Sequence, residues 1–298
     1  MFNKHPKGLI AAALANLGER FGFYTMMAIL VLFLQAKFGM NGKEAGFIYS
    51  TFYFSIYILA LVGGIIADKT RNYKGTIFTG IVLMAVGYLL LAIPSKTPVD
   101  NKMLYLVITC ASLFVIAFGN GLFKGNLQAL VGQMYDNPQY ANMRDSGFSL
   151  FYMFINIGAI FAPFAAVGVR NWWLSTFGYN YDADLPALCH GQLAGTLSPE
   201  ATETYHTLVT KASTAPVQDY TAFASDYLNV FTTGFHYAFG VAIIAMAISL
   251  TIYWLNKKNF PDPSKKTVAS SASSTVVEMS AQEVKQRKYP LFPVFGVG

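Results

Sequence analysis

Six long apolar stretches constrain this chain more than any other feature of its sequence. They cover residues 8–37, 44–67, 75–94, 103–134, 147–169 and 234–255. Crossing the roughly 30 Å hydrocarbon core of a bilayer takes about 20 residues of helix, and each stretch is long enough. Only 12% of the residues are charged, about half the usual share in soluble domains. The sequence therefore predicts an all-α membrane protein, a six-helix transmembrane bundle whose first partner is the lipid bilayer.

Lysines and arginines are distributed unequally between the two faces that six membrane-spanning helices define. The face that holds both chain ends carries roughly twice as many of them as the opposite face. By the positive-inside rule, we expect a multi-pass protein of the cell's inner (plasma) membrane with both ends in the cytoplasm. The net charge of +6 follows from this topology. We expect no nucleic-acid partner, because the charges flank helices and do not form one basic stripe.

The domain organisation follows from where the apolar stretches stop. The six-helix bundle is predicted over residues 1–256, with a long outer loop at about 170–233, in which Pro199 to Ala212 suits a short surface helix. Residues 257–288 lack an apolar helical period and are serine-rich, which is typical of a cytoplasmic linker. Residues 289–298 turn apolar again, and we interpret them as the truncated start of a seventh helix.

The sequence shows no pattern that predicts a metal site or an enzyme. Cys110 lies in the fourth span and Cys189 in the outer loop, so we expect the two thiols not to pair. Cys189, His190 and His206 have no recognised ligand spacing, which favours a solvated loop over a metal site. A nucleophile–base pair, a phosphate-cradling loop and paired buried acids are also missing. We therefore predict neither an enzyme nor a bound cofactor.

Two charged residues in the middle of the first span are the strongest functional signal. Glu19 and Arg20 lie at membrane depth, where an ionised side chain costs at least about 2.5–3.5 kcal/mol unless it faces protein or water. Asn16, Arg20 and Tyr24 share one stripe of the helix, and Glu19 lies one step round. Such residues indicate function by default, although a purely structural Glu–Arg network between helices stays open.

Lys124 is a second cation at membrane depth, in the glycine-rich part of the fourth span. A desolvated lysine changes its protonation readily, whereas an arginine stays charged and suits a fixed clamp for a carboxylate. Tyr57 and Asn156 supply neutral hydrogen-bonding groups at comparable depth in the second and fifth spans. For each of these two taken alone, a bond between neighbouring helices is the simpler interpretation.

Five separated segments carry a recognisable set of motifs. They are Asn16–Tyr24 in the first span, Gly63–Lys69 in the second, Phe118–Lys124 in the fourth, and Arg144–Asp145 with Phe151–Gly158 around the fifth. This set resembles the proton-dependent oligopeptide transporter (POT) family of the major facilitator superfamily. The resemblance covers essentially the whole chain up to the linker and corresponds to the amino-terminal six-helix half of that fold.

The resemblance implies a proton-coupled symporter of di- and tripeptides, with protons as the coupling ion and a missing C-terminal six-helix bundle as partner. By motif position, Arg20 and Lys124 would bind the peptide carboxylate. Tyr24, Tyr57 and Asn156 would line the peptide pocket. The residues expected to serve proton coupling are Glu19, Arg20 and Lys124.

Charged residues at the cytoplasmic side would serve gating or structure: Asp68, Arg144 and Asp145. Asp68 ends the second helix, where the helix dipole disfavours an anion, so it needs a partner. Lys69 and Arg71 are local candidates, and a gate contact with the missing bundle is the other.

The sequence leaves open how Asn16 affects proton coupling, and it allows two alternative functions. Asn16 stands where the motif usually has its first glutamate and cannot take up a proton, so the proton stoichiometry is undetermined. A major facilitator carrier of another small organic anion or nitrate is the main alternative, since Arg20 with Lys124 attracts almost any anion. The other alternative is a non-transporting half-protein that binds a complementary half.

Overall fold

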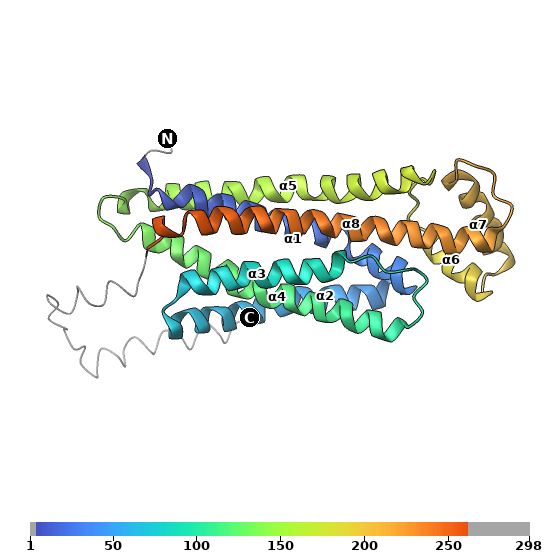
Figure 1. The fold of residues 1–298 in the computed structure, drawn as a ribbon, viewed down its shortest axis with the longest axis horizontal. Helices are drawn as coiled ribbons and strands as arrows, with labels where there is room; N and C mark the ends of the chain where they lie inside the picture. Colours follow the sequence, from blue (N-terminus) through green and yellow to red (C-terminus); the bar gives the residue numbers. More distant parts are fainter. Residues whose placement is uncertain (1–3, 262–298) are drawn as a thin grey trace, which may run out of the picture. The chain divides into compact units, whose positions relative to one another are not determined.

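The computed structural model describes residues 4–261, and the fold that it shows there is helical. Six helices are long and apolar enough to span a membrane, which confirms the predicted fold class (Figure 1). They are α1 (Gly8–Phe38), α2 (Gly42–Thr70), α3 (Tyr73–Ala92), α4 (Lys102–Met134), α5 (Arg144–Thr176) and α8 (Tyr220–Leu255). Two shorter helices, α6 (Leu185–Ala194) and α7 (Pro199–Ala212), lie between α5 and α8. The predicted linker beyond residue 261 and the predicted seventh helix fall outside the described residues.

The connection between α5 and α8 differs most from the sequence prediction. α8 begins at Tyr220, whereas the sequence predicted a start near residue 234. The prediction was late because the first turns of the helix contain the polar residues Asp226, Asn229 and Thr232, which lower the local hydropathy. Asp219 caps this end, accepting hydrogen bonds from the backbone N–H groups of residues 221 and 222 at 2.8 and 2.9 Å. α7 has the bounds expected for the surface helix, whereas α6 was not predicted.

α6 covers the end of α1, and this corrects the interpretation of Cys189 as part of a solvated loop. Cys189 is fully buried in α6. The neighbouring His190 bonds through Nε2 to the carbonyl oxygen of Ala36 in α1 at 2.8 Å. The α6/α7 end of the bundle is therefore packed against the spans by specific contacts.

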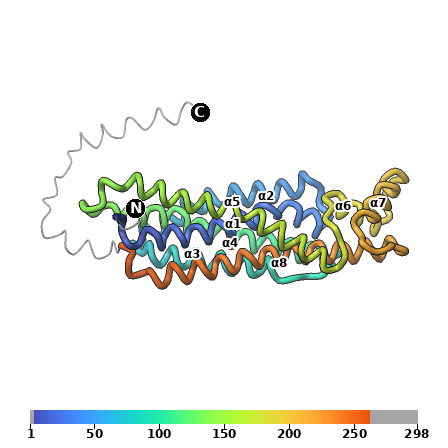
Figure 2. Tube along the Cα trace, turned by 90° about the horizontal axis from the view of Figure 1, so that it is seen from above, coloured from blue at the N-terminus to red at the C-terminus, as the bar shows by residue number. Residues whose placement is uncertain are grey.

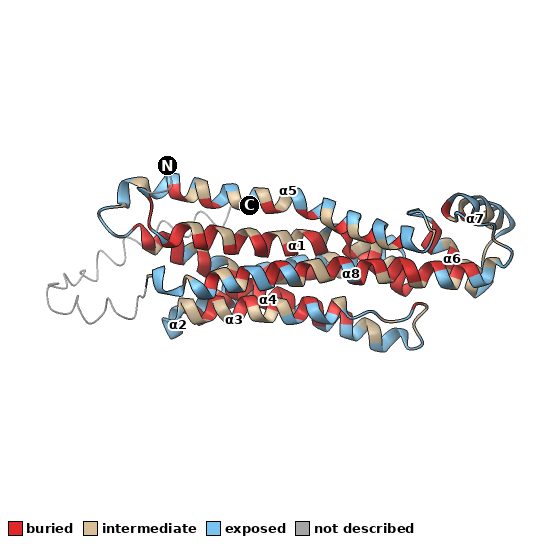
Figure 3. Ribbon diagram, turned by 45° about the horizontal axis from the view of Figure 1, so that its top comes forward, coloured by how far each residue is buried: buried red, intermediate tan, exposed pale blue. Residues whose placement is uncertain are grey.

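The long helices pack in two groups of three, which Figure 1 shows one above the other and which overlap in the view of Figure 2. α1 packs against α5 and α8, while α4 packs against α2 and α3, and α3 also meets α8. Each group therefore has one central helix. Figure 3 shows mostly buried residues along α1. Of the 18 most apolar consecutive residues in each helix, 61% are buried in α1 and 22% in α2. The charged residues of α1 are thus shielded from lipid by protein.

Glycines allow the close crossings that fix these groups. A Cβ at Gly63 of α2 would lie only 2.2 Å from the carbonyl oxygen of Gly121 in α4. A Cβ at Gly158 of α5 would lie 2.8 Å from the carbonyl oxygen of Leu17 in α1. Small residues at such positions let helix backbones approach each other directly in a membrane.

Candidate functional site

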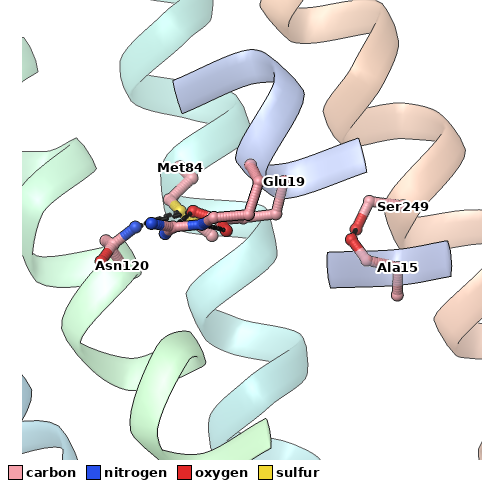
Figure 4. Close-up of polar contacts among 6 residues, drawn as sticks. Ala15, Glu19, Met84, Asn120 and Ser249 are labelled. Atoms are coloured by element: carbon pink, nitrogen blue, oxygen red, sulfur yellow. Dashed lines mark hydrogen bonds and ion pairs between the residues drawn. The ribbon is translucent and has the colours of Figure 1, made fainter. Parts of the chain in front are cut away.

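A buried carboxylate lies at the centre of the candidate site (Figure 4). Glu19 is 0% exposed and Arg20 is 5% exposed. Arg20 donates two hydrogen bonds to Glu19, from Nε to Oε2 and from Nη2 to Oε1, the second at 2.5 Å. Asn120 of α4 donates from Nδ2 to the same Oε1 at 2.7 Å. The carboxylate is therefore paired and hydrogen-bonded inside the bundle, which a buried charge requires.

Tight packing of α1 on α8 sets the direction in which Glu19 points. Ser249 of α8 donates from Oγ to the carbonyl oxygen of Ala15 at 2.6 Å, one turn before Glu19 (Figure 4). A Cβ at Gly18 would lie 3.0 Å from the carbonyl oxygen of Ala245 in α8. This face of α1 is thus closed against α8, while Glu19 reaches Asn120 on α4.

Two polar atoms at this cluster have no hydrogen-bond partner within residues 4–261. They are the hydroxyl oxygen of Tyr88 in α3 and Oδ1 of Asn120, and both are buried. Beside them, Sδ of Met84 lies 3.9 Å from Nδ2 of Asn120. The hydroxyl can donate and accept, and the amide oxygen can accept, so the cluster has spare hydrogen-bonding capacity next to a carboxylate.

Arg20 and Tyr24, two of the predicted site residues, lie together on α1. The guanidinium carbon of Arg20 is 4.8 Å from the ring centroid of Phe23 and 6.0 Å from that of Tyr24. These distances are compatible with cation–π attraction. The charge of Arg20 is thus held by Glu19 on one side and by aromatic rings on the other.

Lys124 and Tyr57 form a second pair, between α4 and α2. Nζ of Lys124 lies 5.6 Å from the ring centroid of Tyr57. Tyr57 is 52% exposed, and its hydroxyl donates to that of Tyr53 at 3.1 Å. Within the described part of the chain, no carboxylate pairs with Lys124, so its ammonium group stays open to an anion.

Asn156 is the predicted pocket residue that the structure does not bring to either pair. It lies on α5 with an exposed side chain. No hydrogen bond joins that side chain to another described residue. Its role in substrate binding stays a prediction.

The expected gating residues lie at the opposite end of the bundle from α6 and α7. Asp68 accepts a hydrogen bond from the hydroxyl of Tyr73. Within residues 4–261 it forms no salt bridge with Lys69 or Arg71, the two local partners that the sequence suggested. Nη1 of Arg144 lies 3.9 Å from Oδ1 of Asp136, with both side chains about half exposed. Among the described contacts, none joins Asp68 to Arg144 or Asp145, and Asp145 is exposed.

Sequence reasoning missed Asn120 and Tyr88 as members of the central cluster. Asn120 carried a usable signal, because it is an amide at membrane depth and lies one helical turn before Lys124. Tyr88 carried none, since a tyrosine in the third span packs equally well as a core residue. Tyr73 was missed because it lies beyond the turn that follows Asp68.

Six helices able to span a membrane, with a buried Glu–Arg pair among them, define a multi-pass membrane protein. The family model described as PTR2, POT family, matches residues 74–291, which is more than half of the chain. The chain therefore belongs to the POT family.

Curated relatives give the same result. The peptide transporter YePEPT of Yersinia enterocolitica is 34% identical over 185 residues, which is 60% of this chain and 34% of that protein. The dipeptide and tripeptide permease A of Enterobacter sp. (strain 638) is 34% identical over 179 residues, or 59% of this chain and 32% of that protein. The chain thus spans about a third of the length of these relatives. Both are transporters, so the family is one of transporters and not of enzymes.

Solved structures support the fold. A crystal structure of the peptide transporter POT in complex with sulfate has a TM-score of 0.58 at 24% identity, covering 90% of this chain and 43% of that one. A POT family transporter in complex with a thioalcohol-conjugated peptide has a TM-score of 0.54 at 24% identity, covering 86% and 39%. At this identity the likeness shows the POT transporter fold alone.

Proposed function

We propose that this chain supplies the amino-terminal half of a proton-coupled symporter of di- and tripeptides. Membership of the POT family and two relatives named for peptide transport support this proposal. The observation that carries it is the buried pair of Glu19 and Arg20 beside α4. A carboxylate that can take up a proton is there bonded to a cation that can bind a substrate carboxylate.

Proton uptake and substrate binding are coupled through this pair. While Glu19 is ionised, it occupies two of the N–H groups of Arg20. Protonation of Glu19 removes its charge and leaves the guanidinium free for a bidentate contact with another carboxylate. Each ligand thus favours binding of the other, which is the thermodynamic requirement for symport.

Lys124 provides the first electrostatic contact for the peptide carboxylate, because its ammonium group is open in the described structure. Tyr57 lies beside it, and Tyr24 lies beside Arg20, so each cation has a phenol that can contact the peptide. Asn156 on α5 completes the pocket. A second six-helix bundle, the partner in this proposal, closes the other side of the site.

The direction of transport follows from sidedness. The protein lies in the inner membrane of the cell. The end of the bundle that carries Asp68, Arg144 and Asp145 faces the cytoplasm, and α6 and α7 face outward. The exposed charges of these three residues then act as gate contacts with the second bundle. Protons enter from the α6/α7 end.

Uptake of labelled dialanine into proteoliposomes with an inward proton gradient tests the proposal. Four proteins are compared: this chain alone, a version completed with a second POT bundle, and the completed version with either Arg20→Ala or Lys43→Met. Lys43→Met serves as the matched control, because Lys43 is an exposed cation away from the site. We expect uptake only by the completed protein, its loss with Arg20→Ala, and no effect of Lys43→Met.

Glu19→Gln separates coupling from binding. This variant should lose proton-driven accumulation but keep exchange of labelled for unlabelled dialanine, because the neutral amide no longer needs a proton. Dialanine uptake unchanged by Arg20→Ala would refute the assignment of the site. If the protein transports nitrate or another small anion and dialanine does not compete, peptides are not its substrates. That result would favour the alternative function, a carrier of small anions.

A further inference from the structure

A cavity of about 250 Å³ lies at the α6/α7 end of the bundle, among α1, α3, α4 and α8. It is separate from the cluster around Glu19. Its walls are mostly apolar, and Leu90, Ile93 and Ile108 line it with exposed side chains. Because these exposed residues belong to membrane-spanning helices or their ends, the cavity opens where a lipid can reach it.

His236 of α8 lines this cavity, and one of its two ring nitrogens has no hydrogen-bond partner among the described residues. The side chain is 4% exposed, and Nδ1 donates to the carbonyl oxygen of Leu91 at 2.6 Å. Nε2 is buried and has no hydrogen-bond partner in residues 4–261. A buried polar atom without a partner is costly, so a ligand that bonds to Nε2 would be favoured.

Lys37 of α1 places an unbalanced positive charge on the same wall. It is 2% exposed, and Nζ donates to the carbonyl oxygens of Ser95 and Lys96 at 2.5 and 3.3 Å and to Oγ1 of Thr97 at 2.8 Å. These acceptors use its three protons but are all neutral. No carboxylate of the described residues pairs with it, and a buried charge of this kind calls for an anion.

The level of the cavity along the helices matches the surface of a bilayer. Lys37 is one residue from the end of α1, Leu91 is one residue from the end of α3, and Tyr105 lies in the first turn of α4. α3 has 20 residues, just enough to cross the hydrocarbon core, so its end lies near the headgroups. A headgroup at this depth therefore meets Lys37 while its acyl chains continue along the helices.

We propose that this cavity binds the headgroup of an anionic glycerol-bearing phospholipid such as phosphatidylglycerol. The phosphate balances the charge of Lys37. Nε2 of a neutral His236 ring accepts a hydrogen bond from a glycerol hydroxyl, and a protonated ring donates one to a phosphate oxygen, so the headgroup satisfies either form. The acyl chains pack on Leu90, Ile93 and Ile108. Choline headgroups lack both the net charge and the hydroxyls.

Binding of short-chain lipids to the purified full chain in a neutral detergent tests the proposal. Dioctanoyl phosphatidylglycerol is compared with dioctanoyl phosphatidylcholine and with glycerol 1-phosphate, which has the headgroup chemistry without chains. The variants are His236→Phe and Lys37→Met, with Lys43→Met as the matched control because Lys43 is an exposed lysine at the same end. Dissociation constants come from titration, and native mass spectrometry counts bound lipids.

We expect phosphatidylglycerol to bind at least about tenfold more tightly than the other two ligands, which corresponds to about 1.4 kcal/mol. His236→Phe and Lys37→Met should each weaken it about tenfold, and Lys43→Met should not. Lys37 also bonds to residues 95–97 in the loop between α3 and α4, so Lys37→Met can lower the stability of the protein. In that case the affinity of His236→Phe for phosphatidylglycerol decides. The proposal is overturned if His236→Phe binds like the wild type, if phosphatidylcholine binds equally well, or if glycerol 1-phosphate binds as tightly as the lipid.

Discussion

Replacing Gly63 by alanine should destabilise the bundle, whereas the same change at the next residue, Gly64, should not. A Cβ at residue 63 would lie 2.2 Å from the carbonyl oxygen and 2.6 Å from the carbonyl carbon of Gly121 in α4. Ordinary contact starts near 3.4 Å, so α2 and α4 must separate by about 1 Å. Overpacking of this kind typically costs about 1–3 kcal/mol. Backbone atoms cannot rotate away, which places the cost in the upper part of that range.

Gly64→Ala is a matched control because a Cβ at that position would meet nothing within 4 Å. Both variants gain the same helix propensity, about 0.8–1.0 kcal/mol for alanine over glycine, so their difference isolates the contact with α4. At roughly 2–4 °C per kcal/mol, Gly63→Ala should unfold about 2–12 °C below Gly64→Ala.

Thermal unfolding of the full chain in one detergent, followed by tryptophan fluorescence, measures this difference. An unfolding temperature of Gly63→Ala equal to or above that of Gly64→Ala would refute the close approach of α2 and α4. The change should also reach the site, because separation of these helices moves Tyr57 away from Lys124. Dialanine uptake by the completed transporter should therefore fall for Gly63→Ala and not for Gly64→Ala.

Three further predictions concern single residues. Asn120→Asp replaces the amide that donates to Glu19 by a second carboxyl group, so the unfolding temperature should fall; an unchanged unfolding temperature would contradict their contact. Burial raises the pKa of the Cys189 thiol to about 12. In a Cys110→Ser variant, maleimide should therefore label the native protein very slowly at pH 8 and the unfolded protein fast, and rapid labelling of the native protein would contradict the burial. Burial lowers the pKa of His190 below 6.5, so the native state favours the neutral ring and loses stability as the pH falls. The unfolding temperature of the wild type should therefore fall more between pH 8 and pH 5 than that of His190→Gln, and equal decreases would argue against it.

The helices were predictable to different degrees because hydropathy reports only part of what makes a helix. α4 lies almost where the sequence predicted it, since its polar residues, such as Asn120 and Lys124, have apolar residues on both sides. α8 extends well before its apolar part, because Asp226, Asn229 and Thr232 find partners or solvent in the folded protein. A polar residue interrupts an apolar pattern whether or not the helix continues through it.

Cys189 shows the same limit in the region between α5 and α8. The segment between the fifth and sixth spans mixes acids with small polar residues, which favoured a solvated loop. In the structure α6 packs against α1 and α8, and the thiol is fully buried. Burial in such a short helix depends on contacts with distant segments, which a local pattern does not contain.

The sequence by itself determined that residues 4–261 form six helices able to span a membrane and that Glu19, Arg20 and Lys124 lie in the middle of such helices. Both follow from local properties, the length of apolar runs and the cost of charge in hydrocarbon. Only the tertiary structure decided that Glu19 meets Asn120, 101 residues away, and that Arg20 and Lys124 belong to separate pairs. Those contacts depend on how each helix is rotated and where glycines such as Gly63 let helices cross, and neither is a property of a single segment.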